Sequence, residues 1–191
     1  MEILKEIFVA FVDYGILIYA IVISSGYLIL ALISSFETLH YFNKNSFVDY
    51  ETIMSSPLAP PISIIAPAYN EGESIVENVR SLLSLHYVNY EVLIINDGSK
   101  DDSLDKLIKA YDLKKVDFAV NQLLPTQKIT GIYKSTNPAY KKLSVVDKEN
   151  GGKGDALNAG LNISRNDHVV CIDVDCLLEQ DALLKIIKPF I

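Results

Sequence analysis

The chain has 191 residues and a formal net charge of −7, with an isoelectric point near 4.9. Proteins that bind nucleic acid usually present a basic face, so this acidic balance argues against a nucleic-acid partner. Two cysteines, Cys171 and Cys176, are too few for a disulfide framework and lack the spacing of a CxxC zinc site. We expect both to be reduced packing residues of a cytosolic domain.

The hydrophobic residues are concentrated near the N-terminus. Residues 14–36 carry no formal charge and are bracketed by Asp13 and Glu37. A run of about 20 apolar residues can cross a bilayer core, and this run is too long for the apolar part of a signal peptide. We therefore predict a transmembrane helix over residues 14–37, with a buried core helix as the alternative. The mixed segment 1–13 is expected to lie along the membrane interface.

Residues 38–61 are polar and irregular and end in Pro57-Leu58-Ala59-Pro60-Pro61, which is typical of a stiff linker. Beyond them, short apolar runs alternate with segments of helical period. This alternation predicts an α/β fold with a mainly parallel sheet and helices on both faces. Strands are expected at residues 62–66, 90–95, 143–146 and 168–172, and helices at 71–85, 101–111, 154–163 and 180–188.

Two details of this pattern can be tested directly. Asp101 is a plausible N-cap of the second helix. Residues 112–142 break the alternation, with two prolines and several basic residues but no clear period. We interpret 112–142 as an inserted loop or small excursion, in which residues 128–133 could form a short strand.

The last predicted strand leads into Asp173-Val174-Asp175. Ligands of parallel sheets bind at the carboxyl ends of the strands. In extended geometry Asp173 and Asp175 would point to the same side. Two carboxylates, together with phosphate oxygens, suit Mg²⁺ or Mn²⁺, and such an ion neutralises charge on a departing diphosphate. The alternative is an ordinary solvated strand end.

A glycine-rich segment, Gly151-Gly152-Lys153-Gly154, precedes the third predicted helix. Such a segment could let the backbone approach a phosphate, with Lys153 as a point charge and a helix N-terminus behind it. It is not a Walker A loop, because Gly154 stands where Ser or Thr is required and Asp147 occupies the position of the first glycine. A flexible turn is the alternative.

Two further motifs follow the first two predicted strands, Pro67-Ala68-Tyr69-Asn70-Glu71 and Asn96-Asp97-Gly98-Ser99. Tyr69 could stack on a base, and Asp97 could accept hydrogen bonds from a base or a ribose. The alternatives are a packing tyrosine and an aspartate that caps its own turn.

In this order, the motifs of residues 62–188 resemble the donor half of family 2 glycosyltransferases. They are most similar to the membrane-bound processive branch that makes chitin, hyaluronan, cellulose and poly-N-acetylglucosamine. The resemblance implies a GT-A fold and inverting, metal-dependent transfer of N-acetylglucosamine or another hexose from a UDP-sugar to a growing polysaccharide. It implies that Tyr69, Glu71 and Asp97 hold the nucleoside, that Lys153 lies near the diphosphate, and that Asp173 contacts ribose or metal. The implied donor-binding residues are Pro67, Tyr69, Glu71, Asp97, Lys153 and Asp173, and the implied ligands of Mg²⁺ or Mn²⁺ are Asp173 and Asp175.

The family also has a catalytic-base aspartate and a Gln/Arg-x-x-Arg-Trp motif well downstream of its Asp pair. This sequence has no tryptophan, and we identify no catalytic base in it. We expect the base beyond Ile191, so that residues 62–191 hold only the donor half of the domain and transfer nothing by themselves. The alternatives are a non-catalytic membrane protein that binds nucleotide sugars, and a membrane adaptor with a decayed fold.

The expected location is the plasma (inner) membrane. Because nucleotide sugars are made in the cytosol, the family implies that residues 62–191 face the cytoplasm. Charge does not decide the orientation, since Lys5 lies on one side of the apolar run and Lys44 on the other.

Overall fold

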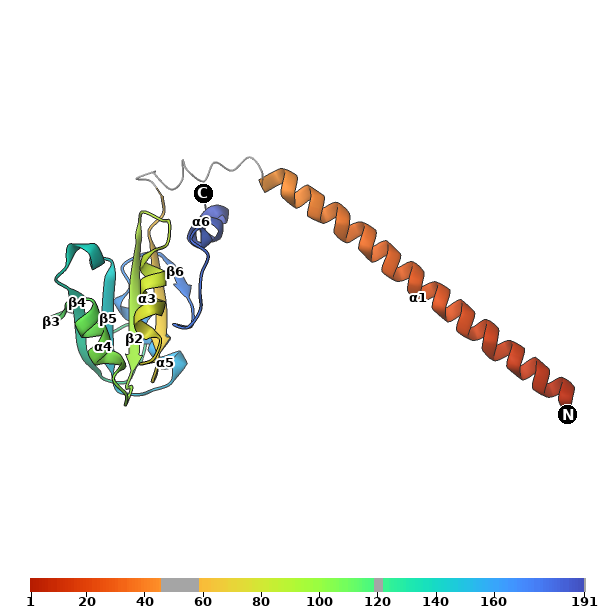
Figure 1. The fold of residues 1–191 in the computed structure, drawn as a ribbon, viewed down its shortest axis with the longest axis horizontal. Coiled ribbons are helices and arrows are strands. Elements are labelled where there is room, and N and C mark those ends of the chain that lie inside the picture. The colour runs from red at the N-terminus through yellow and green to blue at the C-terminus, as the bar shows by residue number, and fades with distance from the viewer. Residues whose placement is uncertain (46–58, 119–121, 191) are drawn as a thin grey trace. The chain divides into compact units, whose positions relative to one another are not determined.

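The computed structural model describes residues 1–45, 59–118 and 122–190. The chain divides into two compact units, Met1–Asp49 and Tyr50–Ile191. One is a single long helix and the other is a layered α/β domain (Figure 1). Each is described by itself.

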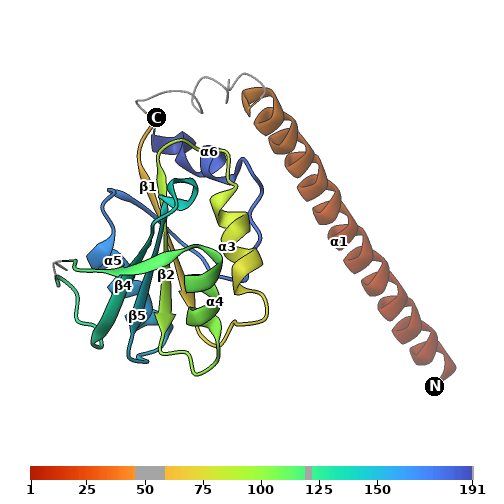
Figure 2. The ribbon, with the colours of Figure 1, turned by 60° about the vertical axis from the view of Figure 1, so that its left-hand side comes forward.

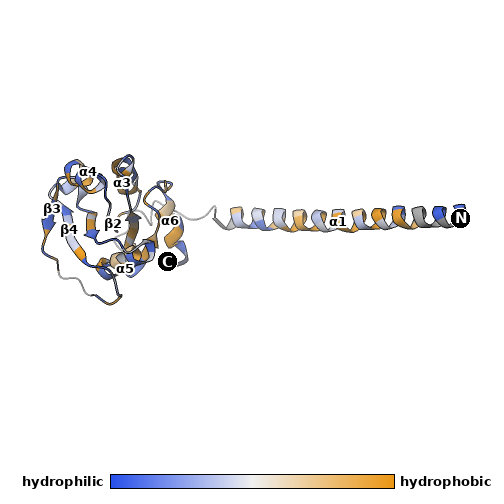
Figure 3. Cartoon of the chain, turned by 90° about the horizontal axis from the view of Figure 1, so that it is seen from below, coloured by the Kyte–Doolittle hydropathy of each residue, from blue (hydrophilic) through white to orange (hydrophobic). Residues whose placement is uncertain are grey.

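The N-terminal unit consists of helix α1, which runs from Glu2 to Asn45. An 18-residue window of its segment Phe11–Phe42 has a mean hydropathy of 2.5, and none of that window is buried. By length and composition, this helix could cross a membrane. Figure 3 shows apolar residues repeated along the middle of this helix. Large apolar side chains cover its whole circumference, as the consecutive exposed residues 16–19 illustrate. This distribution differs from the single apolar stripe of a helix that packs on a soluble core.

The end of α1 differs from the expected boundary. Residues 38–45 were expected in an irregular linker, but they continue the helix. They contain neither proline nor glycine, so nothing local stops the hydrogen-bond ladder. The hydroxyl of Thr38 also donates to the carbonyl of Ser34, one turn earlier (2.8 Å). The remainder of the expected linker, residues 46–58, lies outside the described residues.

A six-stranded sheet organises the second unit, with strand order β3-β4-β5-β2-β1-β6, in which β3 is Leu113–Val116 and β4 is Ile129–Ser135. Strand β1 pairs in parallel with β2 and β6, and β2 pairs in parallel with β5. These four strands are β1 (Ile62–Ala68), β2 (Tyr90–Asp97), β5 (Leu143–Lys148) and β6 (His168–Cys171). The helices are α3 (Ile75–Leu83), α4 (Ser103–Ala110), α5 (Lys153–Ile163) and α6 (Ala182–Ile187), with short 3₁₀ helices η1 (Pro138–Tyr140) and η2 (Lys188–Phe190).

Helices cover both faces of the sheet (Figure 2). On one face, Ile64 of β1 packs in a core that includes residues of α3, α4 and α6. On the other face, Ile65 packs in a second core with Ala156 and Ala159 of α5. Neighbouring residues of one strand are thus buried on opposite sides, which explains why the central strands read as continuous apolar runs. The predicted mainly parallel sheet between helices is therefore present.

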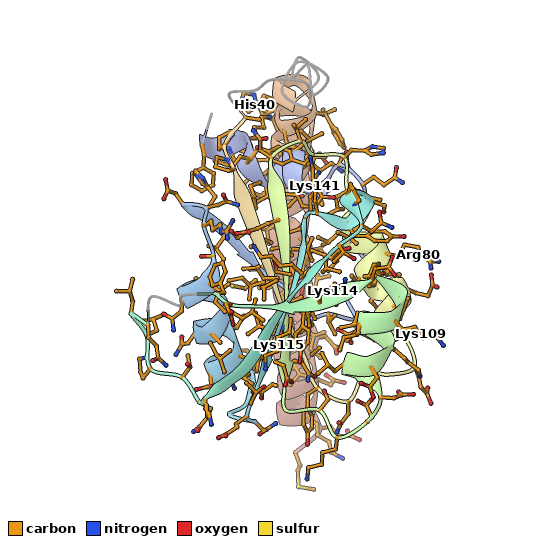
Figure 4. The ribbon with its side chains drawn as sticks, turned by 90° about the vertical axis from the view of Figure 1, so that its left-hand side faces the viewer. His40, Arg80, Lys109, Lys114, Lys115 and Lys141 are labelled. Atoms are coloured by element: carbon orange, nitrogen blue, oxygen red, sulfur yellow. The ribbon has the colours of Figure 1, made fainter. Side chains whose placement is uncertain are left out.

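The interpretation of residues 112–142 as an insertion is wrong for part of the segment. It contributes β3 (Leu113–Val116) and β4 (Ile129–Ser135) to the same sheet, where β4 pairs antiparallel with both β3 and β5. Strand β4 confirms the strand suggested at 128–133. Strand β3 is short and carries Lys114 and Lys115, both exposed along the sheet edge (Figure 4). Lysines on an edge strand oppose pairing with other chains. Because two of its four residues are lysines, β3 lacks the hydrophobic pattern that would predict a strand.

Two helix starts also differ. Helix α3 begins at Ile75 rather than residue 71, after a turn. The N-cap of α4 is Asp102, whose side chain makes no capping bond, so the prediction that Asp101 is the N-cap is wrong. Asp101 instead accepts hydrogen bonds from the backbone N–H of Ser103 (3.1 Å) and of Gly72 (2.8 Å). Its carboxylate joins the loops that follow β1 and β2.

Candidate donor-binding site

The carboxyl ends of β1, β2 and β6 meet at one edge of the sheet because the three strands are parallel. A pocket of about 250 Å³ lies at this edge. It is lined by Pro67, Ala68, Tyr69, Glu71, Asp97, Lys153, Asp173, Val174 and Asp175. All seven residues expected from the sequence to bind the donor or the metal therefore lie around one cavity. Their individual roles remain predictions.

The segment after β1 presents Tyr69 to solvent, with 45% of its surface exposed. The next residue, Asn70, has a positive φ of 57° and turns the chain. Its backbone N–H donates to the hydroxyl of Ser99 (2.9 Å), and its side-chain oxygen accepts from the N–H of Lys100 (2.8 Å). These bonds fix the turn against the loop after β2 and leave the Tyr69 ring free to stack on a planar ligand.

Asp97, the last residue of β2, is 3% exposed and is surrounded by donors of its own chain. Its Oδ1 accepts from Lys148 Nζ (2.5 Å) and from the N–H of Gly151 (3.0 Å). Its Oδ2 accepts from the N–H of Gly152 (2.7 Å). Both carboxylate oxygens thus hold protein groups, and the side chain fastens the glycine-rich segment to the end of β2.

Close approach of two loops explains the glycine that follows Asp97. Gly98 has a φ of +66°, and a Cβ at this position would lie 2.7 Å from the backbone nitrogen of Asn150. The side-chain amide of Asn150 donates to the carbonyl of Asp97 (2.8 Å). Gly152 also has a positive φ, 84°, and is the N-cap of α5. We call residues 149–152 the glycine loop. Its residues contact Asp97 at the end of β2, and α5 begins directly after it, with Lys153 at the pocket.

Lys153, the first residue of α5, makes an exposed ion pair with Asp173. The Lys153 Nζ lies 2.5 Å from Asp173 Oδ1, and the two side chains are 62% and 50% exposed. The hydrogen bond to Asp173 raises the pKa of Lys153, and the negative charges of Asp173 and Asp175 add to this effect. Lys153 is therefore a permanent cation at the mouth of the pocket.

The Asp pair lies in a turn rather than on an extended strand. Strand β6 ends at Cys171, and the N–H of Cys176 donates to the carbonyl of Asp173 (3.0 Å). Val174 is 2% exposed and anchors the turn. The expected reason for the proximity of the two carboxylates, strand alternation, is therefore wrong, although the turn does bring them together.

A divalent cation fits the chemistry of this turn. Candidate ligand atoms of Asp173, Asp175 and Cys176 all lie within 4.8 Å of one another, and the three residues are exposed. Carboxylate oxygens are the donors that Mg²⁺ and Mn²⁺ prefer, whereas a thiol suits softer metals. Asp173 and Asp175 are therefore the residues that would hold such an ion. The exposure of Cys176, and of Cys171, corrects the expectation that they are packing residues.

One charged residue of this region, Lys148, lies outside the motifs recognised in the sequence. Lys148, the last residue of β5, is 1% exposed and belongs to the largest fully buried side chains. Besides Asp97, its Nζ lies 2.5 Å from Asp155 Oδ1 and 2.6 Å from the carbonyl of Glu149. A usable signal was present, because this lysine ends an apolar strand directly before the glycine loop, and buried lysines require partners.

Comparison with known proteins identifies the family. The sequence pattern of the family described as Glycosyl transferase family 2 matches residues 63–140 and 125–191. The chain belongs to glycosyl transferase family 2. Among curated relatives, poly-beta-1,6-N-acetyl-D-glucosamine synthase of Staphylococcus epidermidis is 30% identical over 132 residues, and that of Staphylococcus aureus (strain COL) is 30% identical over 129 residues. Each match covers 68% of this chain and 25% of the relative, so the chain spans about a quarter of their length.

A solved structure supports the fold. Mannosyltransferase PcManGT from Pyrobaculum calidifontis, in complex with GDP-Man and Mn²⁺, superimposes with a TM-score of 0.51 at 22% sequence identity. The match covers 83% of this chain and 42% of that chain. The expected GT-A-like fold of this glycosyltransferase domain is thereby confirmed.

Proposed function

We propose that the α/β unit binds the nucleotide-sugar donor of a glycosyltransferase that extends a polysaccharide. One observation carries the proposal: Tyr69, Lys153 and the Asp173–Asp175 turn come from three separate segments and converge on one pocket. In parallel sheets, the carboxyl ends of the strands are where ligands bind. An aromatic ring, a cation and two carboxylates match the base, the diphosphate and the metal of a chelated nucleotide.

In this arrangement the nucleoside lies against Tyr69, and the diphosphate lies between the glycine loop and Lys153. The α5 N-terminus points at the same place and favours anions. As the glycosidic bond to the diphosphate breaks, negative charge grows on the leaving oxygen. Lys153 stabilises that charge, because its ammonium group stays protonated. A divalent cation held by Asp173 and Asp175 would neutralise part of the same charge.

The nature of the sugar is inferred from the relatives. The two staphylococcal synthases named above are poly-N-acetylglucosamine synthases, so we infer UDP-N-acetylglucosamine as the donor and a growing N-acetylglucosamine polymer as the acceptor. Transfer would invert the anomeric carbon. These residues supply the donor side of that reaction.

Donor binding can be tested by titration calorimetry of the whole chain with UDP and with UDP-N-acetylglucosamine, in Mn²⁺ or in a chelator. We expect binding only with Mn²⁺, and we expect Asp175→Asn to remove most of the metal dependence. Asp117→Asn is the matched control, because Asp117 is an exposed aspartate outside the pocket. Equal affinity with and without the metal would refute the metal role, and no binding in either condition would refute the donor site.

We further propose that α1 anchors the chain in the plasma membrane, with residues 1–13 at the interface and residues 62–191 in the cytoplasm. With 44 residues α1 is about 66 Å long, which exceeds a hydrocarbon core of about 30 Å. The chain should therefore stay with the membrane fraction after alkaline washing. Release into the supernatant would contradict the anchor.

Orientation can be read from the two cysteines. They are the only cysteines of the chain, and both are exposed in the α/β unit. A membrane-impermeant maleimide added to intact spheroplasts should leave them unlabelled, and labelling should follow lysis. Labelling of intact spheroplasts would place this unit outside. A variant with a single cysteine added at exposed Asp117 controls for reagent access.

A further inference from the structure

Lys148 is the buried cation beneath the glycine loop. Its side chain is 0% exposed, and its ammonium group lies within 2.5 Å of one oxygen of Asp97 and one of Asp155. The ammonium group donates hydrogen bonds to Asp97 and, at 2.6 Å, to the carbonyl of Glu149. Two of its three N–H donors are thus used in hydrogen bonds to Asp97 and Glu149, and the ion pair with Asp155 engages the same ammonium group. Because this side chain is fully buried among groups of its own chain, it does not reach a ligand.

The two carboxylates that Lys148 joins hold different parts of the site. Asp97 accepts from the backbone N–H groups of Gly151 and Gly152, as described above. Asp155 lies in the first turn of α5, and its second oxygen accepts from the backbone N–H of Gln127 (2.9 Å). One buried charge therefore connects the end of β2, the end of β5, the glycine loop and the start of α5.

The charge balance makes this connection depend on the lysine. Two carboxylates face one ammonium group, and the excess negative charge is met by backbone N–H groups and by the N-terminus of α5. If an uncharged residue replaced Lys148, the carboxylates of Asp97 and Asp155 would lie close together without a cation between them. Like charges at such a distance favour protonation or separation, and either change weakens the hold of Asp97 on the two glycine amides.

We propose that Lys148 is a positioning residue that holds the glycine loop in the shape that receives the donor diphosphate. It acts through Asp97 and Asp155 and does not touch the donor. The inference rests on the proposed donor site and adds a residue to it.

The test compares two nucleotides that share a base and a ribose but differ in one phosphate. UMP and UDP are titrated in Mn²⁺ against the wild-type chain, Lys148→Met and Lys148→Arg. We expect Lys148→Met to weaken UDP binding on the order of tenfold, as losses of outer supporting partners commonly do, with a much smaller loss for UMP. Lys148→Arg keeps the charge and should recover part of the preference for UDP.

Lys142→Met is the matched control. Lys142 lies just before the other end of β5, is half-buried, and contacts the carbonyl of Tyr87 and the ring of Tyr90. Its loss should lower stability without changing the ratio of UMP to UDP dissociation constants. A folded Lys148→Met chain with the wild-type ratio would overturn the inference. If the wild-type chain bound neither nucleotide, the proposed donor site itself would fail.

A second variant keeps the test decisive if Lys148→Met does not fold. Asp155→Ala removes one partner of Lys148 from a position that is 19% exposed, so the variant should be tolerated. Hydrogen exchange, followed by mass spectrometry, should become faster in the peptide that contains Gly151 and Gly152, and the preference for UDP should fall. Unchanged exchange together with an unchanged preference would overturn the inference.

Discussion

Two lysine–aspartate pairs flank the glycine loop, and they differ in almost everything except length. Lys148 with Asp97, and Lys153 with Asp173, each have an N–O distance of 2.5 Å. The first pair is 0% and 5% exposed, whereas the second is 62% and 50% exposed. Removing one partner of a buried pair leaves an uncompensated charge, while an exposed pair is screened by water and contributes little. The buried pair therefore stabilises the fold, whereas Lys153 and Asp173 of the exposed pair can leave each other to bind a ligand.

The largest effect is expected from breaking the buried pair. Lys148→Met should lower the free energy of unfolding by about 3–5 kcal/mol, because Asp97 and Asp155 lose their cation. Urea denaturation of the detergent-solubilised chain, followed by far-ultraviolet circular dichroism, measures this. A loss below about 1 kcal/mol would show that water or rearrangement compensates the charge, and the contrast between the two pairs would disappear.

The next largest loss of stability is expected where the glycine loop packs closely against Gly98. Gly98→Ala places a methyl group against Asn150 and forces a side chain onto a φ of +66°. We expect a loss of about 1–3 kcal/mol in the same denaturation experiment. Gly154→Ala is the control, because nothing lies within 4 Å of a Cβ there and the residue is helical. This control should be neutral or slightly stabilising. An equal loss in both variants would argue against close packing of Asn150 on Gly98.

Breaking the exposed pair should separate stability from binding. Lys153→Met should leave the denaturation midpoint nearly unchanged, since both partners can be hydrated, yet it should weaken UDP binding by removing the cation at the pocket mouth. Calorimetry and denaturation are run on the same preparation. A large loss of stability with unchanged UDP affinity would reverse the assigned roles of the two pairs.

The smallest effect concerns pH and the surface carboxylate of Asp101. The hydrogen bond from the Ser103 hydroxyl, with smaller help from backbone N–H groups, lowers the pKa of Asp101 from its ordinary value of 3.8. A carboxylate with a lowered folded pKa stabilises the fold above 3.8, and this contribution is lost as the pH falls through the folded pKa. The stability difference between the wild type and Asp101→Asn should therefore shrink under acidic conditions. A difference that stays constant below pH 3.8 would contradict this assignment.

The sequence located the pocket well because its signals are local. Each motif follows a strand, and parallel strands bring their carboxyl ends together whatever their order, so Tyr69, Lys153 and Asp175 could be grouped without knowing the topology. What could not be predicted depends on distant pairing. The partner of Asp97 is Lys148, 51 residues away, and a lysine in a strand normally indicates solvent.

Sequence patterns predicted the structure poorly in short segments, where few residues distinguish a strand, a turn or a helix start. Strand β3 has four residues, two of which are lysines, so pairing with β4 rather than hydrophobic alternation defines it. The Asp173–Asp175 segment illustrates a right outcome reached for a wrong reason, since burial of Val174 in a turn orients the neighbouring carboxylates. In the same way, the choice between Asp101 and Asp102 as N-cap depends on contacts with the loop at Gly72.

The long sequence separation within the Lys148 cluster also has a consequence for the order in which the chain folds. Strands β1 and β2 with helix α3 form a local unit, but the contacts of Asp97 with Lys148 and with Gly152 span 51 and 55 residues. Contacts of this kind form only after the intervening chain has been closed, which slows their appearance. A nascent chain that has completed β2 therefore still lacks a phosphate site. Nucleotide binding becomes a reporter of the moment when β5 has docked beside β2.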